Sequence, residues 1–273
     1  HKIEFIQGDI RDLGLLRRAF AGAEVIFHEA ALPSVPRSIA DPLATNENNI
    51  DGTLNVLVAA KEMGVKRVVI AASSSAYGDT ERLPKVENMP ANPLSPYAVT
   101  KYVGELYGRV FSRVFGLETV SLRYFNVFGP RQDPASQYAA VIPKFILAML
   151  RGEQPLIHGD GNQSRDFTYV DNVVEANLLA AKVPGIGGEV FNIGCGARFT
   201  LNELVAALNR ILGTRITPRY GPPRPGDVRH SLASIEKAGK LLGYRPTVGF
   251  EAGLKRTVDW FVALDGEGGR ERH

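Results

Sequence analysis

The chain has 273 residues, 44% apolar and 22% charged, which is enough material for one large domain or two modest ones around a packed core. Its 32 Lys and Arg residues are scattered among 29 Asp and Glu residues, which argues against nucleic-acid binding but still allows single arginines to hold an anionic small molecule. Cys195 is the only cysteine and the five histidines lie far apart, so we expect no disulfide, no metal site, no membrane span and a reducing, cytoplasmic setting.

The first half of the chain alternates predicted strands with predicted helices. Apolar runs predict strands at residues 3–6, 24–27, 67–71 and 118–122, and helical spacing predicts helices after an N-cap at Asp12 and over residues 48–63 and 95–116. This alternation is typical of an α/β fold with a parallel sheet and helices on both faces. Ligands bind such sheets beyond the carboxyl ends of the strands, where Asp9, residues 28–31 and residues 73–75 would lie.

The second half has long loops rich in glycine and proline, interrupted by short elements. Helices are predicted over residues 142–150, 171–181, 200–212 and 250–264, a strand over residues 190–193 and a loop over residues 221–227. Thr200 and Glu203 form a capping box at the start of one of these helices. The change in texture predicts a sheet domain over residues 1–130, a smaller, partly interleaved domain over residues 131–264, and a flexible tail over residues 265–273.

One predicted helix carries two side chains that suggest chemistry. It begins with Ser95 as N-cap and Pro96 as first helical residue, and it places Tyr97 and Lys101 four residues apart on one face. The positive end of the helix and the ammonium should lower the pKa of Tyr97, which would make it a proton-transfer group near neutral pH. Taken alone, the same spacing more often marks an ordinary surface pair.

Further polar residues lie at predicted strand ends and on loops. Residues 73–75 are three serines after a strand, where a hydroxyl could relay a proton between Tyr97 and a substrate or could simply be solvated. Asn126 ends another strand and could bind a polar group or cap a turn. Arg165 and Arg224 lie on loops rich in glycine or proline and suit a bidentate grip on phosphate, although either alone could be a surface arginine.

Together these segments resemble the extended short-chain dehydrogenase/reductases, and within them the nucleotide-sugar 4-epimerases. The resemblance covers nearly the whole chain in the order of the family. It rests on Gly8-Asp9-Ile10-Arg11-Asp12, His28-Glu29-Ala30-Ala31, Asn48-Asn49-Ile50-Asp51-Gly52-Thr53, Ser73 to Gly78, Ser95-Pro96-Tyr97-Ala98-Val99-Thr100-Lys101, Leu122 to Asn126, Ser164-Arg165-Asp166-Phe167 and Arg224-Pro225-Gly226-Asp227.

The resemblance implies a Rossmann-type sheet that holds NAD and a smaller C-terminal domain that binds the substrate. NAD would contact Asp9 and Ile10 at the adenine, Glu29, Ala30, Ala31 and Leu32 along the pyrophosphate and ribose, and Asn49, Tyr97, Lys101 and Phe125 around the nicotinamide half. No glycine-rich dinucleotide loop occurs, and the chain opens in a predicted strand. We therefore expect the sequence to lack the N-terminal part of the family's sheet and to be incomplete at its start.

The resemblance also implies the reaction. Tyr97 would take the proton of the sugar 4-hydroxyl while hydride leaves C4 for the nicotinamide, Lys101 would hold the ribose and keep Tyr97 deprotonated, and Ser73 or Ser74 would hydrogen-bond the same oxygen, with Ser73 favoured. The 4-keto sugar would rotate and receive hydride on its other face. The UDP-sugar would contact Ser73, Ser75, Asn126, Arg165, Arg224, Asp227 and Ser231, with backbone help from Ala140, Val141, Ile142, Leu156 and His158.

Two departures from the family refine the substrate. Ser74 and Ser75 stand where dehydratases and decarboxylases carry an acid, so elimination lacks its proton donor. Ser231 stands where galactose-type epimerases often carry tyrosine, which leaves room for a 2-N-acetyl group and favours UDP-GlcNAc and UDP-GalNAc, with UDP-Glc and UDP-Gal as further candidates. The alternatives are a UDP-glucuronate 4-epimerase and a truncated homologue that binds nucleotide sugar without catalysis. The family also implies a homodimer, through a helix pair that could include residues 95–116.

Overall fold

A four-stranded parallel sheet organises the computed structural model, which describes residues 3–133, 140–223 and 228–268. The strand order is β1 (Val25–His28), β2 (Arg67–Ser73), β3 (Glu118–Tyr124) and β8 (Glu189–Ile193). The register pairs Ile70 of β2 with Ser121 of β3 and with His28 of β1. Strands β1, β2 and β3 therefore end at one edge of the sheet. The predicted α/β architecture is confirmed.

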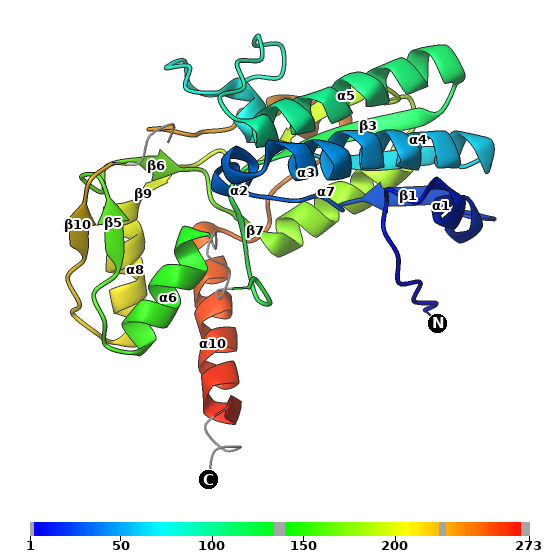
Figure 1. The fold of residues 1–273 in the computed structure, drawn as a ribbon. Helices are drawn as coiled ribbons and strands as arrows, with labels where there is room; N and C mark the ends of the chain where they lie inside the picture. The colour runs from blue at the N-terminus through cyan, green and yellow to red at the C-terminus, as the bar shows by residue number, and fades with distance from the viewer. Residues whose placement is uncertain (1–2, 134–139, 224–227, 269–273) are drawn as a thin grey trace.

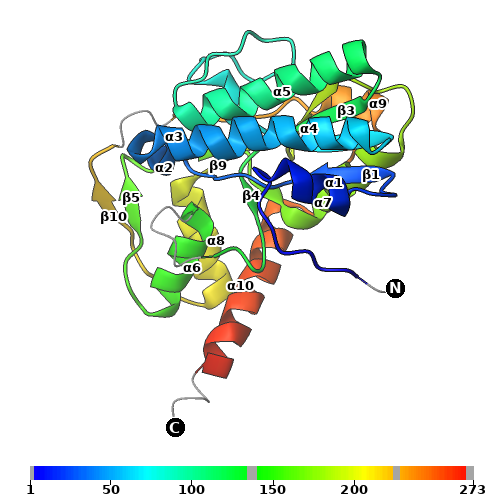
Figure 2. The same cartoon turned by 45° about the vertical axis from the view of Figure 1, so that its right-hand side comes forward.

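Helices cover both faces of this sheet. On one face α4 (Gly52–Glu62) and α5 (Pro96–Phe115) lie side by side, as Figures 1 and 2 show, and they pack with α1 (Leu13–Ala19) against Val68 and Ile70. On the other face α7 (Val170–Lys182) and α9 (Glu236–Leu241) pack against Val69, Val120 and Leu122. Successive β2 side chains thus alternate between two buried helical layers, as the pleat of a central strand requires.

The segment between β1 and β2 is more broken than its sequence predicts. The helix predicted over residues 48–63 is present as the π-helical turn η1 (Glu47–Asp51) followed by α4, but two short helices that were not predicted, α2 (Val35–Ala40) and α3 (Pro42–Asn46), precede it. Asp41 caps α3 by accepting a hydrogen bond from the Ala44 amide at 2.9 Å. The turn η1 widens the helix at Asn49. The Asn49 side chain points toward the loop after β1, where it accepts a hydrogen bond from the Leu32 amide.

A second hydrophobic core lies away from the sheet, at the lower left of Figure 1. It is built from α6 (Val141–Leu150), α8 (Leu201–Leu212) and α10 (Phe250–Gly268), with buried Phe128 and Ile146 among its members. The capping box of Thr200 and Glu203 at the start of α8 is confirmed. Short strand pairs complete this region: β10 (Arg219–Gly221) with β5 (Leu156–His158), β4 (Val127–Phe128) with β7 (Thr168–Tyr169), and β6 (Ser164–Arg165) with β9 (Phe199–Thr200); the 3₁₀ turn η2 (Ser74–Tyr77) follows β2.

The prediction of a strand at the start of the chain was wrong. Residues 3–6 form no strand: Ile3 is 92% and Phe5 85% exposed, and no described strand offers the hydrogen-bonding neighbour that a strand requires. Helix α10 extends through residue 268, past the helix end predicted at residue 264, and residues 269–273 lie outside the described part of the chain, so the flexible tail over residues 265–273 remains a prediction. Of the loop predicted over residues 221–227, Gly221 ends strand β10, and residues 224–227 lie outside the described part of the chain.

Candidate active site

An open cavity of about 560 Å³ lies at the carboxyl edge of the sheet, where β2 and β3 end. Two walls enclose this cavity, which we call the sheet edge and the loop side. The sheet edge consists of Glu29, Ser73, Tyr97, Lys101 and Tyr124; the loop side consists of Arg165, Val228, His230 and Ser231. The cavity brings together these predicted site residues: Glu29, Ala31, Ser73, Ser74, Ser75, Tyr97, Lys101, Phe125, Asn126, Arg165 and Ser231.

The start of α5 positions the predicted tyrosine and lysine. Ser95 caps the helix by accepting a hydrogen bond from the Ala98 amide at 3.2 Å, and Pro96 occupies the first turn, as predicted. Tyr97 and Lys101 then face the cavity from successive turns. The Lys101 Nζ donates to the Ala71 carbonyl of β2 at 2.7 Å, which ties the helix to the strand edge.

The predicted lowering of the Tyr97 pKa is wrong for this structure. Burial raises the pKa of Tyr97, because the phenolate is disfavoured in a low-dielectric site, and the hydrogen bond with Ser73 offsets only part of that rise. Lys101 turns its ammonium toward the Ala71 carbonyl rather than acting as the main influence on the phenol. Tyr97 is therefore a neutral phenol at pH 7 in this structure.

The pKa values of Lys101 and His28 both lie below the values usual for their residue types. Burial lowers the pKa of Lys101 to about 8, while the Glu29 carboxylate opposes that change. Burial, followed by the charge of Lys101, lowers the pKa of His28 to about 4, so its ring is neutral at pH 7. The Thr53 hydroxyl donates to the Asn49 carbonyl at 2.6 Å, so His28 Nε2 must donate to Thr53 Oγ1 at 2.9 Å, which fixes the tautomer.

The three serines differ in what holds them. Ser73 caps the turn η2: its Oγ accepts from the Ser75 amide at 3.2 Å and from the Ser75 hydroxyl at 2.8 Å. Ser73 is also the serine that hydrogen-bonds Tyr97. All three line the cavity, but this geometry favours Ser73 over Ser74 as the hydroxyl that shares a substrate oxygen with Tyr97.

Asn49 lies behind the cavity and shapes it. Its Oδ1 accepts from the Leu32 amide at 2.7 Å, and its Nδ2 donates to the Leu32 carbonyl at 3.1 Å and to Thr100 Oγ1 at 3.1 Å. Leu32 and Ala30 do not line the cavity. Asn49 therefore clamps the loop after β1 against α5, and its predicted direct contact with NAD remains a prediction.

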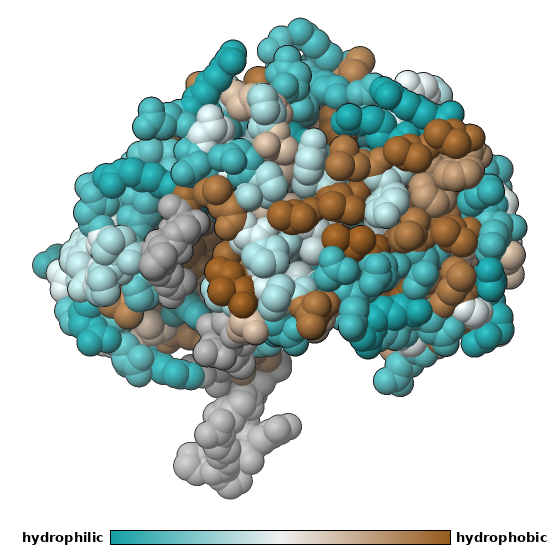
Figure 3. Space-filling model, turned by 45° about the horizontal axis from the view of Figure 1, so that its top comes forward, coloured by the Kyte–Doolittle hydropathy of each residue, from teal (hydrophilic) through white to brown (hydrophobic). Residues whose placement is uncertain are grey.

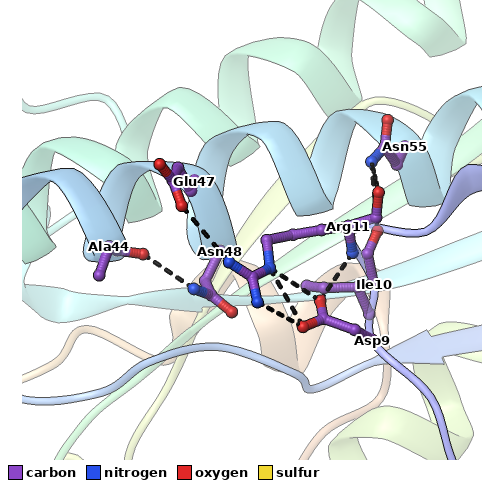
Figure 4. A network of polar contacts seen from close by, with 7 residues as sticks. All are labelled: Asp9, Ile10, Arg11, Ala44, Glu47, Asn48 and Asn55. Atoms are coloured by element: carbon purple, nitrogen blue, oxygen red, sulfur yellow. Dashed lines mark hydrogen bonds and ion pairs between the residues drawn. The ribbon is translucent and has the colours of Figure 1, made fainter.

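Asp9 and Ile10 belong to a separate polar cluster beside η1 (Figure 4). The Arg11 guanidinium lies between Asp9, at 2.7 Å, and Glu47, at 3.3 Å, and it holds the pKa of the Asp9 carboxyl below its usual value. The Asn55 amide donates to the Ile10 carbonyl at 3.3 Å and to the Arg11 carbonyl at 3.1 Å. Arg11 already occupies most acceptor positions of Asp9, so its role at an adenine also remains a prediction.

The residues present fit the nicotinamide half of NAD. Lys101 has three N–H donors and the Ala71 carbonyl takes one, so two remain for ribose hydroxyls. Tyr97 offers a hydroxyl beside it, and the buried Phe125 supplies an apolar wall. When bound there, NAD would supply the hydride acceptor for a sugar held between Tyr97 and the loop side.

The predicted substrate residues fall into four groups. Asn126, Arg165 and Ser231 line the cavity, and Arg165 donates to the Arg229 carbonyl at 3.1 Å. Arg165 also borders a second hollow, of about 340 Å³, which contains Val141, Leu156 and His158. Ala140 and Ile142 line neither hollow, since the Ile142 side chain is buried in the core around α6, and Arg224 and Asp227 lie outside the described residues.

Sequence reasoning missed three polar residues that line the cavity. Lys85 has a side chain only 2% exposed, and its backbone pairs with the segment that follows Ser231. His230 Nδ1 lies 2.8 Å from Ser164 Oγ, and Tyr124 ends β3. Tyr124 could have been found from its place directly before Phe125 at a strand end, whereas nothing local marks Lys85 or His230.

The described residues include neither a candidate membrane span nor a candidate metal site. No helix there is both long enough and apolar enough to cross a bilayer. Groups of three or more acidic, histidine or cysteine side chains arranged to hold a metal ion are likewise absent from residues 3–133, 140–223 and 228–268.

Comparison with known proteins places the chain in a family. The model of the NAD dependent epimerase/dehydratase family matches residues 1–194. The UDP-glucose 4-epimerase of Mycolicibacterium smegmatis is 40% identical over 264 residues, 95% of this chain and 83% of that protein. The UDP-N-acetylglucosamine 4-epimerase of Methanobrevibacter ruminantium, solved with UDP-N-acetylmuramic acid, is 43% identical over 95% of this chain and 83% of its own, with a TM-score of 0.91. The Thermotoga maritima UDP-glucose 4-epimerase, solved with UDP-glucose, is 42% identical over 95% of this chain and 84% of its own, with a TM-score of 0.92. The chain belongs to the NAD dependent epimerase/dehydratase family.

Proposed function

We propose that this chain catalyses the NAD-dependent 4-epimerisation of a UDP-sugar through a 4-keto intermediate. The observation that carries the proposal is the meeting of Ser73, Tyr97 and Lys101 in one cavity at the carboxyl edge of the sheet. The similarity to UDP-sugar 4-epimerases at about 40% identity supports the same reaction class. Tyr97 accepts the proton of the 4-hydroxyl, Ser73 hydrogen-bonds the same oxygen, and Lys101 supplies positive charge beside them.

We infer that the base form of Tyr97 depends on Lys101 being charged in the loaded site. Burial alone keeps the phenol neutral, so a cation must lower its pKa before it can accept a proton. Lys101, with a pKa of about 8, is protonated at pH 7 and can do so.

We propose UDP-GlcNAc and UDP-GalNAc as preferred substrates, with UDP-Glc and UDP-Gal as possible further ones. Ser231 lines the cavity with a small side chain, held by a hydrogen bond from its amide to the Ser164 carbonyl at 3.0 Å. A Ser231→Tyr variant should lose turnover of N-acetylated sugars and keep turnover of plain ones. Assaying both substrate pairs checks this, and an unchanged ratio of the two turnover rates would contradict the pocket argument.

UDP-glucuronate is the second candidate substrate. Lys85 and Arg165 both line the cavity, so a uronic carboxylate would meet positive charge. Incubating the chain and NAD with UDP-GlcNAc, UDP-Glc and UDP-GlcA in parallel, and separating the products by chromatography, distinguishes the candidates. Binding of all three sugars without any product would instead support a non-catalytic homologue.

We propose that the chain works as a homodimer in the cytoplasm, with residues 131–264 serving mainly to bind substrate. Apolar side chains gather on the exposed face of α5, as Figure 3 shows, and this face supports a helix-to-helix contact between two copies. Its exposed members are Val99, Leu106, Val110, Val114 and Phe115. Sedimentation of the chain and of a Val110→Glu variant tests the interface, since only the variant should run as a monomer.

A further inference from the structure

A single carboxylate stands out in the cavity. Among the described residues that line it, Glu29 is the one acidic side chain, whereas Lys85, Lys101 and Arg165 are basic. A site that takes a negatively charged nucleotide sugar is weakened by a carboxylate unless that carboxylate serves another group. Glu29 therefore needs a partner within the cavity, and its neighbours identify one.

A chain of hydrogen bonds fixes Glu29 from the far side of the sheet. The Tyr124 hydroxyl, at the end of β3, donates to Glu29 Oε1 at 2.8 Å. The Asn177 amide of α7 donates to that same hydroxyl at 2.8 Å and to the Val173 carbonyl at 2.9 Å. Three elements, the end of β1, the end of β3 and α7, thus hold one carboxylate above the end of β2.

Lys101 is the cation that shares the sheet edge of the cavity with this carboxylate. Its ammonium is anchored on the Ala71 carbonyl of β2, between the strand ends that carry Glu29 and Tyr124. Burial lowers the pKa of Lys101, and the charge of Glu29 opposes that change. Burial likewise raises the pKa of Glu29, and the hydrogen bond from Tyr124 and then the charge of Lys101 oppose that rise. The other titratable groups around Lys101 are neutral at pH 7, namely His28 from β1, Tyr97 from α5 and Tyr124 from β3.

We propose that Glu29 is a positioning residue that keeps the partly buried Lys101 protonated, and that Tyr124 and Asn177 hold Glu29 in place for this purpose. The consequence for catalysis rests on the proposed function, because the charge of Lys101 matters there through Tyr97. The charge relation itself belongs to the folded chain and can be measured without turnover.

The test follows the titration of Lys101 by NMR in chain labelled with ¹³C at the lysine Cε, with Lys101→Arg used to assign its signal. The unchanged chain should give a midpoint near 8. Glu29→Gln should give a lower midpoint, Tyr124→Phe a smaller decrease, and Glu29→Asp should restore part of the value. Glu24→Gln, which removes an exposed carboxylate paired with Lys66 at 2.7 Å, is the matched control and should leave the midpoint unchanged.

Equal Lys101 midpoints in the unchanged chain and in Glu29→Gln would overturn the proposal, provided that the circular dichroism of the two is the same. If Glu29→Gln fails to fold, Tyr124→Phe takes its place. Equal Lys101 midpoints in Tyr124→Phe and in the unchanged chain would then overturn the proposal. If the chain turns over UDP-sugar, its activity should decline as the pH rises. This decline should begin at a lower pH in Glu29→Gln than in the unchanged chain, because Lys101 loses its proton at a lower pH in the variant. A shifted midpoint in a chain without epimerase activity would keep this inference and reject the proposed function.

Discussion

The sheet edge and the loop side of the cavity are built by different means. The sheet edge is held by strand register and buried bonds: Lys101 is anchored on β2, and the Arg123–Glu105 ion pair ties β3 to α5 with both side chains at most 4% exposed. The loop side depends on two-residue strands and on surface contacts such as Arg229–Asp160, whose side chains are 67% and 50% exposed. Under the proposed function, the sheet edge would carry the chemistry and the more weakly held loop side would recognise the substrate.

The largest effect is expected from removing the base on the sheet edge. Tyr97→Phe should lower kcat for epimerisation by about 10²–10⁴-fold, the usual contribution of a general acid–base group. The fold should persist, because the substitution removes only the hydroxyl that meets Ser73. Steady-state kinetics and a melting curve check both statements. Tyr102→Phe on the same helix is the control and should keep full activity; equal activity in the two variants would remove Tyr97 from the mechanism.

The next largest effect compares an arginine that supports the sheet edge with one that supports the loop side. Arg123→Leu leaves Glu105 buried without its cation, which should lower the free energy of unfolding by about 3–5 kcal/mol. Arg229→Leu breaks an exposed pair and should cost about 0–1 kcal/mol. Urea denaturation of the two variants measures the difference. Similar losses would show that the two walls are equally rigid.

Lowering the pH should change the stability contributions of the two sides of the cavity in opposite directions. His28, on the sheet-edge side, has a folded pKa of about 4 below its ordinary 6.5, so its contribution to stability is present above 6.5 and is lost as pH falls through 4. Asp166, behind the loop side, has a folded pKa of about 6 above its ordinary 3.8, because burial outweighs the bonds from the amides of Cys195, Gly196 and Ala233. Its contribution is present below 3.8 and is lost as pH rises through 6.

Each of these two shifts corresponds to roughly 3 kcal/mol, at 1.36 kcal/mol for each pKa unit. As the pH falls from 7 to 4, the free energy of unfolding of His28→Gln should therefore rise relative to that of the unchanged chain. The free energy of unfolding of Asp166→Asn should fall relative to that of the unchanged chain. Denaturation curves at pH 4, 5, 6 and 7 provide the comparison. A change of the same sign in both variants would show that these two groups do not set the acid response.

The sequence allowed the sheet edge to be predicted far better than the loop side. Ser95, Pro96 and the capping box at Thr200 act within a few residues, so their roles can be read locally, and strand ends in a parallel sheet must meet at one edge. The raised pKa of Tyr97, the buried Lys85 and the bond from Tyr124 to Glu29 depend on contacts between distant segments. Local patterns carry no information about such burial, which explains why the pKa of Tyr97 was predicted in the wrong direction.

The most direct test of the account is the fate of the hydrogen at C4 of the sugar. Incubating the chain with NAD and UDP-GlcNAc in D₂O, and following the sugar by proton NMR, should give UDP-GalNAc that carries no deuterium at C4, because the hydrogen leaves and returns as hydride. Tyr97→Phe should slow formation of this product without changing its label. Deuterium at C4, or the absence of UDP-GalNAc, UDP-Gal and 4-epimerised UDP-glucuronate from the three parallel incubations, would contradict the account.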